Sequence, residues 1–495
     1  MRRRHAGPRR IRAPAMRRLI AAALAAILAW ASAAAQAADA TAWVTTGDRS
    51  RLLAPEDGLP FKAATTPAAP GTTAIEVDPA RRYQAMVGFG AAVTDASAWL
   101  IEHRMTAAQR DALLRELFGR TEVDGRAGVG FGFTRLTIGA SDFSLHPYSL
   151  DDLPPGAVDP SLAGFAIPPQ AADVFAVVRA ARAVNPQLAV MASPWSAPAW
   201  MKTGGALAGG TLEPGMEDVF SRYLLRYVDA AAAAGVPVFA LTIQNEPHFE
   251  PKDYPGMKLS AAQRSEIIGR HLGPLIARRG LATQILEWDH NWDRPQEPLA
   301  VLADARARRH IAGVAWHCYD GNAQAQNLVH DAHPEVDAWF TECSGGAWKP
   351  DWAETLPWMV EQVIIGATRG WARGVLLWNL ALDEADGPHS GGCNDCRGVV
   401  TIDSATGAVT RNLEYYALAH ASRFVRAGAR RIASTSGVDG VATVAFRNAD
   451  DGGIVLIACN AGAAERRLRI ADGGLAFEHR LPPHSVATYT WAARR

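Results

Sequence analysis

The chain has 495 residues, of which 48% are hydrophobic and 20% charged, and it contains 15 Trp, 15 Phe and five Cys. This length fits one large domain with a smaller one, and the aromatic content excludes a chain that is disordered throughout. Five cysteines in such a length are too few for a disulfide-based scaffold. The 50 basic and 50 acidic residues balance, but this balance depends on the N-terminus.

The N-terminal segment 1–37 has the features of a secretory signal peptide. It contains eight arginines and no acidic residue, an apolar run over 19–30, and Ala-Gln-Ala at 35–37. A membrane anchor is the alternative, but a span needs about 20 strongly apolar residues. Removing the eight arginines from the 50 basic residues leaves 42 against 50 acidic ones, a net charge of −8. We therefore expect an exported protein, periplasmic or secreted, that does not bind nucleic acid.

Eight short apolar runs recur along the chain from residue 88, and amphipathic stretches follow them. The runs end near 94–95, 141–142, 193–195, 245–246, 289–290, 317–319, 341–342 and 378–379. The amphipathic stretches are clearest at 107–118, 171–184, 217–234 and 261–279. Buried strands that alternate with helices in this way predict an α/β fold, a (β/α)8 TIM barrel over 88–416. An open doubly wound sheet is the alternative, but no Gly-rich phosphate loop follows the first strand.

The two chain ends predict a second, smaller domain. Residues 38–70 are rich in Ala, Thr and Pro without a clear period, which predicts a linker, and a short strand follows at 74–77. Within 417–495, apolar positions alternate over 441–446 and a continuous apolar run covers 453–458, each after an Asp-Gly turn. This pattern is typical of an antiparallel β-sandwich. We expect the strand within 38–87 to join this sandwich, so that both chain ends build it.

A barrel of this kind carries its active site at the carboxyl ends of its strands. The residues that gather there are Asp95, Asp142, Trp195, Asn245, Glu246, His317, Tyr319, Glu342 and Trp378. Aromatic faces stack on the C–H surfaces of sugars, and two carboxyl groups are the minimum for hydrolysing a glycosidic bond. Glu246 ends the fourth strand and Glu342 the seventh, across the barrel from each other. Either one alone could cap the following helix, but the pair beside aromatic residues favours catalysis.

Six motifs follow one another in a characteristic order. They are Gly-Phe-Gly-Ala-Ala-Val-Thr-Asp-Ala-Ser at 88–97, Ser-Pro-Trp-Ser-Ala-Pro-Ala-Trp-Met-Lys at 193–202, Gln-Asn-Glu-Pro at 244–247, Trp-His-Cys-Tyr at 316–319, Thr-Glu-Cys at 341–343 and Leu-Trp-Asn-Leu-Ala-Leu at 377–382. Asn-Glu-Pro alone is only moderately specific, whereas the first two blocks in this order are highly specific. From about residue 83 onward the chain resembles glycoside hydrolase family 30, the glucosylceramidase-like enzymes. The resemblance implies a barrel packed against a β domain formed by both chain ends.

The resemblance also implies a role for each matching residue. Glu246 would be the acid/base and Glu342 the nucleophile of a retaining mechanism. The residues that bind the sugar or orient the nucleophile would be Asp95, Trp195, Asn245, His317, Tyr319, Trp378 and Asn379. We expect the negative charge of Glu342 to raise the pKa of Glu246, and the carboxyl groups to lie about 5–5.5 Å apart. No metal and no other cofactor is implied.

The remaining candidates are cysteines and one buried cation. Cys393 and Cys396 form a single Cys-x-x-Cys, which is half a zinc site at most, so a local disulfide is favoured in an exported protein. Cys318 and Cys343 flank the site as buried thiols or as a bridge. Arg135 lies within the second strand, and we expect it to orient a catalytic carboxylate rather than to form only a structural ion pair.

The sequence thus predicts an exported retaining β-glycosidase that acts on β-glucosyl linkages of a glycolipid or a β-glucan. A glucosylceramidase-like β-glucosidase of sphingolipid metabolism is the first interpretation, and an endo-β-1,6-glucanase is the alternative. The loop over 383–397 would separate the two. A β-xylosidase-type relative comes third, and a carbohydrate-binding protein with an inactive barrel is the non-enzymatic alternative, although both glutamates are present. No obligate protein partner is indicated.

Overall fold

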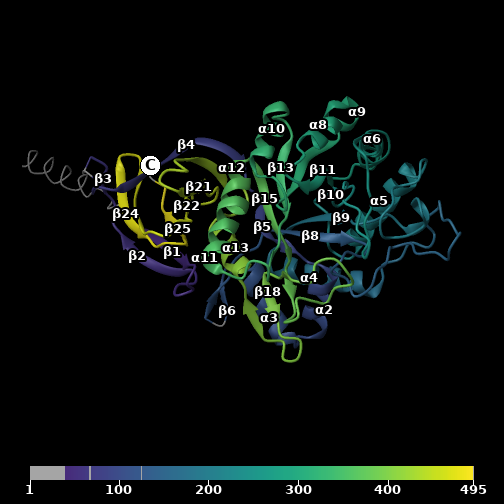
Figure 1. The fold of residues 1–495 in the computed structure, drawn as a ribbon, viewed down its shortest axis with the longest axis horizontal. Coiled ribbons are helices and arrows are strands. Elements are labelled where there is room, and N and C mark those ends of the chain that lie inside the picture. The colour runs from purple at the N-terminus through teal and green to yellow at the C-terminus, as the bar shows by residue number, and fades with distance from the viewer. Residues whose placement is uncertain (1–38, 66–67, 124, 494–495) are drawn as a thin grey trace, which may run out of the picture.

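A computed structural model describes residues 39–493 apart from 66–67 and 124 (Figure 1). It has two parts, a strand-rich one drawn in purple and yellow at the left and a barrel with its helices at the right. The predicted signal peptide at 1–37 lies outside the described residues. None of the helices in the described part has the length and apolar composition that a membrane span requires.

Eight parallel strands form the barrel in the order in which they follow along the chain. They are β5 (Gly88–Ala92), β8 (Phe133–Ile138), β9 (Ala189–Pro194), β10 (Ala240–Thr242), β11 (Gln284–Asn291), β12 (Ile311–His317), β13 (Asp337–Glu342) and β15 (Ala372–Asn379). β15 pairs with β5, and Gly132 N donates a hydrogen bond to Phe89 O at 3.0 Å, which brings β5 against β8. The predicted (β/α)8 barrel is confirmed, and each of the eight predicted runs coincides with one of these strands.

Helices follow the strands and cover the outside of the barrel (Figure 1). They are α2 (Asp95–His103), α3 (Ala107–Phe118), α4 (Pro169–Val184), η1 (Ala199–Met201), α5 (Glu217–Ala233), α6 (Ala261–Glu266), η2 (Ile267–Leu272), α7 (Gly273–Arg279), α8 (Gln296–Ala303), α9 (Ala305–Arg308), α10 (Gln324–Ala332), α11 (Trp352–Trp358), η3 (Met359–Gly366), α12 (Ala367–Arg369) and α13 (Leu413–Ser422). In α4, Val174, Val177, Val178 and Ala181 are buried at helical spacing. The four predicted helical stretches all coincide with observed helices.

The end of the barrel away from the site is filled by apolar side chains. Seven of the eight strands contribute one each: Phe133, Met191, Ala240, Leu286, Ala315, Trp339 and Leu376. Trp339 needs a glycine beside it, because a Cβ at Gly313 would lie 2.5 Å from its ring. This packed layer closes the barrel, so only the carboxyl ends of the strands are open to a ligand.

The second part is one ten-stranded sheet that encloses its own apolar core. Its strands are, from edge to edge, β2 (Ala54–Leu59), β1 (Ala40–Thr46), β25 (Ser485–Trp491), β22 (Ile454–Asn460), β21 (Val441–Arg447), β20 (Arg430–Ser434), β4 (Thr72–Ala85), β23 (Arg466–Asp472), β24 (Leu475–Leu481) and β3 (Lys62–Ala63). From the N-terminal segment, β4 lies between β20 and β23, and β1 lies beside β25. Both chain ends therefore build this domain, as predicted.

The predicted linker over 38–70 is wrong where β1, β2 and β3 fall within it. Ala40, Ala42 and Val44 alternate toward the core. The period is hidden in the sequence because two of these side chains are alanine and the residues between them include threonine. Smaller sheets in the loops are formed by β6 (Glu122–Val123), β7 (Arg126–Ala127), β14 (Gly345–Gly346), β16 (Ala381–Leu382), β17 (Cys396–Arg397), β18 (Val400–Ile402) and β19 (Val409–Arg411).

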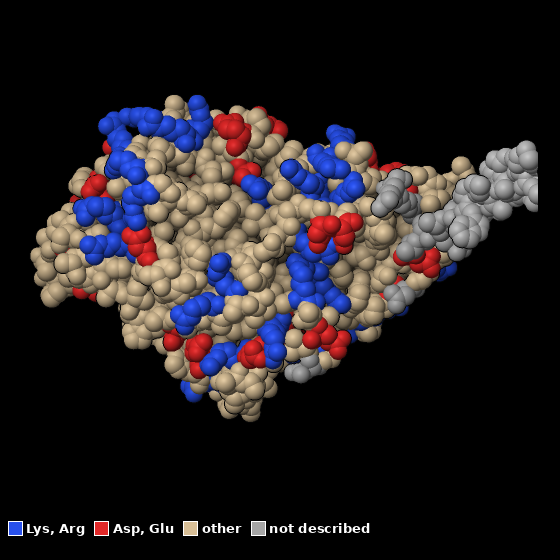
Figure 2. Space-filling model, turned by 180° about the vertical axis from the view of Figure 1, so that it is seen from behind, with Lys and Arg blue, Asp and Glu red and all other residues tan. Residues whose placement is uncertain are grey.

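A buried histidine joins the two domains. His420 of α13 contacts Thr45 Oγ1 with Nε2 at 2.8 Å and Thr488 Oγ1 with Nδ1 at 2.9 Å, which ties the helix to β1 and β25. Burial lowers the pKa of His420 to about 3, so the ring is neutral in this interface. Seen from behind, basic and acidic side chains are interspersed on the surface, and neither sign forms a continuous field over that face (Figure 2).

Candidate active site

A cavity of about 560 Å³ opens at the carboxyl ends of the barrel strands. Its size falls within the range of about 300–1,000 Å³ that is usual for ligand sites. The residues in its wall are Asp142, Trp195, Asn245, Glu246, Phe249, Asp253, Tyr254, His290, Asn291, Tyr319, Glu342, Trp348, Trp378, Gly392, Cys393 and Cys396. Both predicted catalytic glutamates are therefore in one cavity, together with several aromatic rings.

The spacing of the two glutamates sets the kind of chemistry available. A carboxylate oxygen of Glu246 and one of Glu342 lie within 4.8 Å of each other. This separation is close to the about 5–5.5 Å of retaining glycosidases and leaves no room for the water that inverting enzymes hold between carboxyl groups about 6.5–9.5 Å apart. Glu246 has a left-handed backbone with φ of 48°, and its N–H donates to Asp289 O at 3.0 Å. Such strained conformations are concentrated at functional sites.

Two donors hold the carboxylate of Glu342. Tyr319 donates its hydroxyl hydrogen to Oε1 at 2.9 Å, and the guanidinium of Arg135 contacts Oε2. Arg135 also donates to Asn245 Oδ1 at 2.7 Å and to Asp289 Oδ2 at 2.9 Å. Burial alone would lower the pKa of Arg135, but Asp289 and Glu342 raise it, so the guanidinium stays charged. The contact fits the prediction that Arg135 orients a catalytic carboxylate.

Asp289 is the centre of the polar network beneath the glutamates. Its carboxylate contacts Arg135, Ser193, Thr242, His317 and Thr341. Burial raises the pKa of Asp289, but the charge of Arg135 and the hydrogen bond from His317 outweigh it and hold the pKa far below its ordinary value. A bulge turns the side chain inward, since Trp288 and Asp289 have φ of 75° and 57° and the pairing with β12 shifts there. The sequence marked Asp289 as a strand end but gave it no role.

His317 connects Asp289 to Glu246, the predicted acid/base. Its Nδ1 lies 3.2 Å from Glu246 Oε1 and its Nε2 lies 3.0 Å from Asp289 Oδ1. Burial lowers the pKa of His317, but the charge of Glu342 and the bonds to Asp289 and Glu246 raise it overall to about 9. The ring is therefore protonated at neutral pH, and both of its nitrogens donate.

The same protonation bears on metal binding. Among the described residues, Glu246, His317 and Glu342 form the one group of side chains close enough to share a metal ion. A protonated imidazole has no free lone pair with which to bind a cation. The carboxylate of Glu342 is already in contact with the guanidinium of Arg135. These residues therefore suit a sugar and a proton better than a metal.

The expected pKa shift of Glu246 needs a correction. The sequence predicts that Glu342 raises it, whereas the pKa of Glu246 is lowered. Burial does raise it, but the hydrogen bond from His317 and the positive charges of His317 and Arg135 outweigh burial. The sequence placed His317 near Glu342, the predicted nucleophile, and could not reveal that its ring bonds Glu246 instead.

Stacked indoles form one wall of the cavity. Trp195 and Trp378 have ring centroids 5.0 Å apart and planes inclined by 18°, and Phe143 meets Trp378 edge-on at 6.3 Å. Asp142 stands beside them, and burial together with the charge of Glu342 raises its pKa to about 8. A largely protonated carboxyl group can both donate to and accept from a sugar hydroxyl.

Two predicted sugar-binding residues lie behind this wall. Asp95 begins α2 and accepts hydrogen bonds from Ser144 Oγ at 2.6 Å and Tyr148 Oη at 3.3 Å. Asn379 accepts from Thr94 Oγ1 at 2.8 Å. Neither belongs to the wall of the cavity, and His317, also predicted for the site, does not belong to it either. The prediction that Asp95 lines the sugar pocket is therefore corrected to Asp142, because the buried start of α2 turns Asp95 away from the opening.

Two disulfides fix the loops around the cavity. Cys318 pairs with Cys343, which joins the ends of β12 and β13, so the open choice between thiols and a bridge is settled in favour of a bridge. Cys393 pairs with Cys396 in the loop after β15, as favoured from the sequence. This loop also reaches across the cavity, where Gly392 N donates to Asp253 Oδ2 at 3.1 Å.

Two carboxyl groups at this spacing, at the open end of a (β/α)8 barrel and beside stacked indoles, define a retaining glycoside hydrolase. The chain belongs to glycosyl hydrolase family 30: residues 86–425 match its TIM-barrel domain and residues 428–489 its beta sandwich domain. It is a retaining β-glycosidase of that family, as the motifs predicted.

Known relatives cover nearly the whole chain. The sequence is 34% identical to an endo-1,6-beta-D-glucanase of Neurospora crassa, over 88% of this chain and 91% of that protein. It is 27% identical to the lysosomal acid glucosylceramidase of Mus musculus, over 84% of this chain and 83% of that protein. Among solved structures, the endo-beta1,6-glucanase BT3312 has a TM-score of 0.83 and 31% identity, covering 92% of this chain and all of that one.

Proposed function

We propose that the protein is an endo-β-1,6-glucanase, the alternative interpretation of the sequence. The observation that carries the proposal is the similarity to glucanases of this specificity, which extends through both domains at 34% identity, against 27% for the glucosylceramidase. Substrate specificity depends on loops outside the catalytic pair, and greater overall identity favours shared loops.

The mouth of the cavity supports a polymeric substrate. Phe249, Tyr319 and Trp348 are 46%, 45% and 48% exposed there. Large aromatic side chains left this exposed commonly mark binding surfaces. Rings spread around an opening can contact sugar units on both sides of the one held by the buried indoles, which an endo-acting enzyme requires.

Catalysis needs a proton on Glu246, although the hydrogen bond from His317 and the nearby cations lower the pKa of this group. Two cations, Arg135 and His317, lie among the carboxylates of Asp289, Glu246 and Glu342. The three carboxylates outnumber the two cations by one charge, so one added proton makes the five side chains neutral together. The mechanism needs that proton on Glu246, where it can reach the leaving oxygen. Arg135 and Tyr319 meanwhile hold the carboxylate of Glu342 in place for attack on the anomeric carbon.

The second half of the reaction uses the same groups. When Glu342 forms the glycosyl ester, its negative charge disappears and Glu246 has lost its proton to the leaving sugar. Glu246 is then the base that takes a proton from water, which releases the sugar with its β configuration retained. The positive charge of His317, 3.2 Å away, stabilises Glu246 in this ionised form.

We also propose that residues 1–37 direct export. The two disulfides support this proposal, since such bonds persist in oxidising compartments such as the periplasm or the medium. Cleavage can be tested by expressing the full chain and determining the N-terminus of the protein recovered outside the cytoplasm. An intact N-terminus on cytoplasmic protein would contradict export.

The substrate proposal is tested by comparing β-1,6-glucan, glucosylceramide and an aryl β-glucoside with the same enzyme preparation. Short β-1,6 oligomers with little glucose released from the lipid are expected. Glucose from the lipid without oligomers from the glucan would restore the glucosylceramidase interpretation. Glu342→Gln is the control, because it should abolish turnover of all three substrates while leaving the fold intact.

A further inference from the structure

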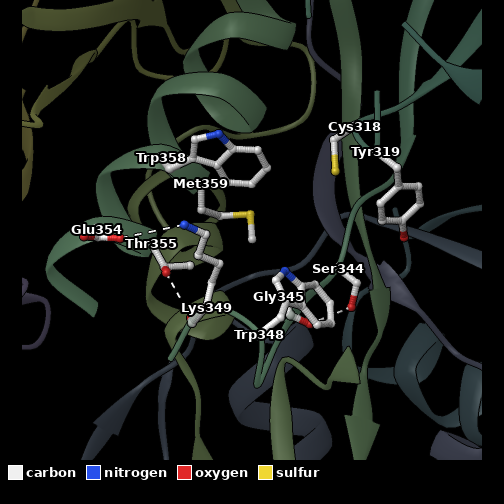
Figure 3. Close-up of a pocket in the computed structure, with 10 residues that line it drawn as sticks. All are labelled: Cys318, Tyr319, Ser344, Gly345, Trp348, Lys349, Glu354, Thr355, Trp358 and Met359. Carbon is white, nitrogen blue, oxygen red and sulfur yellow. Dashed lines mark hydrogen bonds and ion pairs between the residues drawn. The ribbon is translucent and has the colours of Figure 1, made fainter. Parts of the chain in front are cut away.

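A second cavity, of about 490 Å³, lies beside the catalytic one (Figure 3). Tyr319 and Trp348 belong to the walls of both cavities. The hydroxyl of Tyr319 holds the nucleophile, as described above, while its ring is 45% exposed. A ligand that occupies the catalytic cavity therefore shares two aromatic neighbours with anything bound in the second one.

Aromatic rings and polar groups surround this second cavity together. Trp358, at the end of α11, is 44% exposed, and Trp348 stands across from it (Figure 3). The rim carries Lys349 and Glu354, with Nζ and Oε2 3.9 Å apart, and below it the hydroxyl of Thr355 donates to Lys349 O at 3.0 Å. A sugar has both C–H surfaces and hydroxyl groups, whereas an alkyl chain has only C–H surfaces. Indole faces next to charged and hydroxyl groups therefore match a sugar better than an alkyl chain.

The loop that carries Trp348 is built to hold the ring in place. A Cβ at Gly346 would lie 1.8 Å from Cζ3 of Trp348, so the indole rests directly on the backbone there. Gly345 and Gly346 form β14, which pairs with β17, and Ala347 N donates to Asp395 O at 2.8 Å. The shared aromatic wall is therefore anchored to the loop closed by the second disulfide.

We propose that the second cavity binds a glucosyl unit of the same β-1,6-glucan chain whose scissile unit lies against Trp195 and Trp378, with Trp358 as its stacking platform. This inference rests on the proposed glucanase function and extends it to a site for a more distant sugar. Trp358 lines the second cavity and does not line the catalytic one. It should therefore affect long substrates and leave the reaction of short ones unchanged.

The experiment compares Trp358→Ala with wild type on β-1,6-linked oligomers of increasing length and on an aryl β-glucoside. For long oligomers, kcat/KM should fall about 10-fold, the effect of losing one aromatic stacking partner. For the aryl glucoside it should stay within about twofold, because that substrate fills only the catalytic cavity. Trp358→Phe keeps an aromatic face and should recover most of the activity on long oligomers.

Several outcomes would overturn the inference. Equal losses on the long oligomers and on the aryl glucoside would give Trp358 only a structural role, and unchanged kinetics on long oligomers would remove it from the substrate path. A selective loss on glucosylceramide would assign the cavity to a lipid chain. Failure of the proposed function looks different, since wild-type enzyme would then leave β-1,6-glucan intact.

Discussion

Replacing Asp289 by asparagine should cost more stability than any single hydrogen bond in the site explains. The carboxylate is completely buried and pairs with two cations, Arg135 and His317, which Glu342 and Glu246 also contact. The amide of the Asp289→Asn variant would keep the shape of the side chain and remove its charge. Removing one partner from a buried ion-pair cluster costs about 3–5 kcal/mol. At about 2–4 °C per kcal/mol this corresponds to a fall in Tm of roughly 6–20 °C.

Ser193→Ala is the matched control, because it removes a hydrogen bond of 2.7 Å to Asp289 and a contact of 2.6 Å with Thr242 Oγ1, and leaves the charges in place. That change should cost about 1 kcal/mol. Thermal unfolding of both variants at pH 6 measures the difference. Because the folded-state pKa of Asp289 is lowered, its stabilisation is complete above the unfolded value of about 3.9 and is lost only as pH falls below it. Equal losses in the two variants would refute the role of Asp289 as a charge centre.

Three further outcomes follow from the same network. Glu246→Ala should slow glucan hydrolysis by about 10²–10⁴-fold and an activated aryl glucoside far less, because only the glucan needs the proton; equal losses would count against Glu246 as the acid. The pKa of His317 is raised from 6.5 to about 9, so its stabilisation, about 3 kcal/mol, is complete below pH 6.5 and disappears as pH rises to 9. His317→Gln should flatten this part of the stability profile measured by urea unfolding, and an unchanged slope would contradict the assignment. Activity after EDTA treatment should equal that of untreated enzyme, whereas a loss restored by added metal would overturn the metal-free mechanism.

The repeating pattern of the chain predicted the barrel well, because each strand is buried on both faces and reads as a continuous apolar run. The strands of the N-terminal segment were harder to find. Ala40 and Ala42 are completely buried, yet alanine contrasts weakly with the threonines around it. Their burial depends on β25, which lies more than 400 residues further along the chain.

The position of a site residue was predictable where it stands directly at a strand end, as for Glu246 and Glu342, which line one cavity. It was less predictable where orientation decides. Asp95 and Asp142 both follow barrel strands, and only the packing of α2 shows which carboxyl group faces the cavity. Asp289 needed a bulge to turn inward, and neither the bulge nor the lowered pKa of Glu246 follows from residue spacing. Trp348 lies six residues after Glu342 in a glycine-rich loop, and this position was a signal that the sequence offered.

The most direct test of the central claim is to follow β-1,6-glucan hydrolysis by proton NMR and record which anomer of the new reducing ends appears first. Carboxylate oxygens within 4.8 Å predict double displacement. The β anomer should therefore appear first, on shortened oligomers, and mutarotate slowly to the equilibrium mixture. Initial formation of the α anomer would contradict the two-glutamate mechanism, and glucose alone as the first product would contradict endo action.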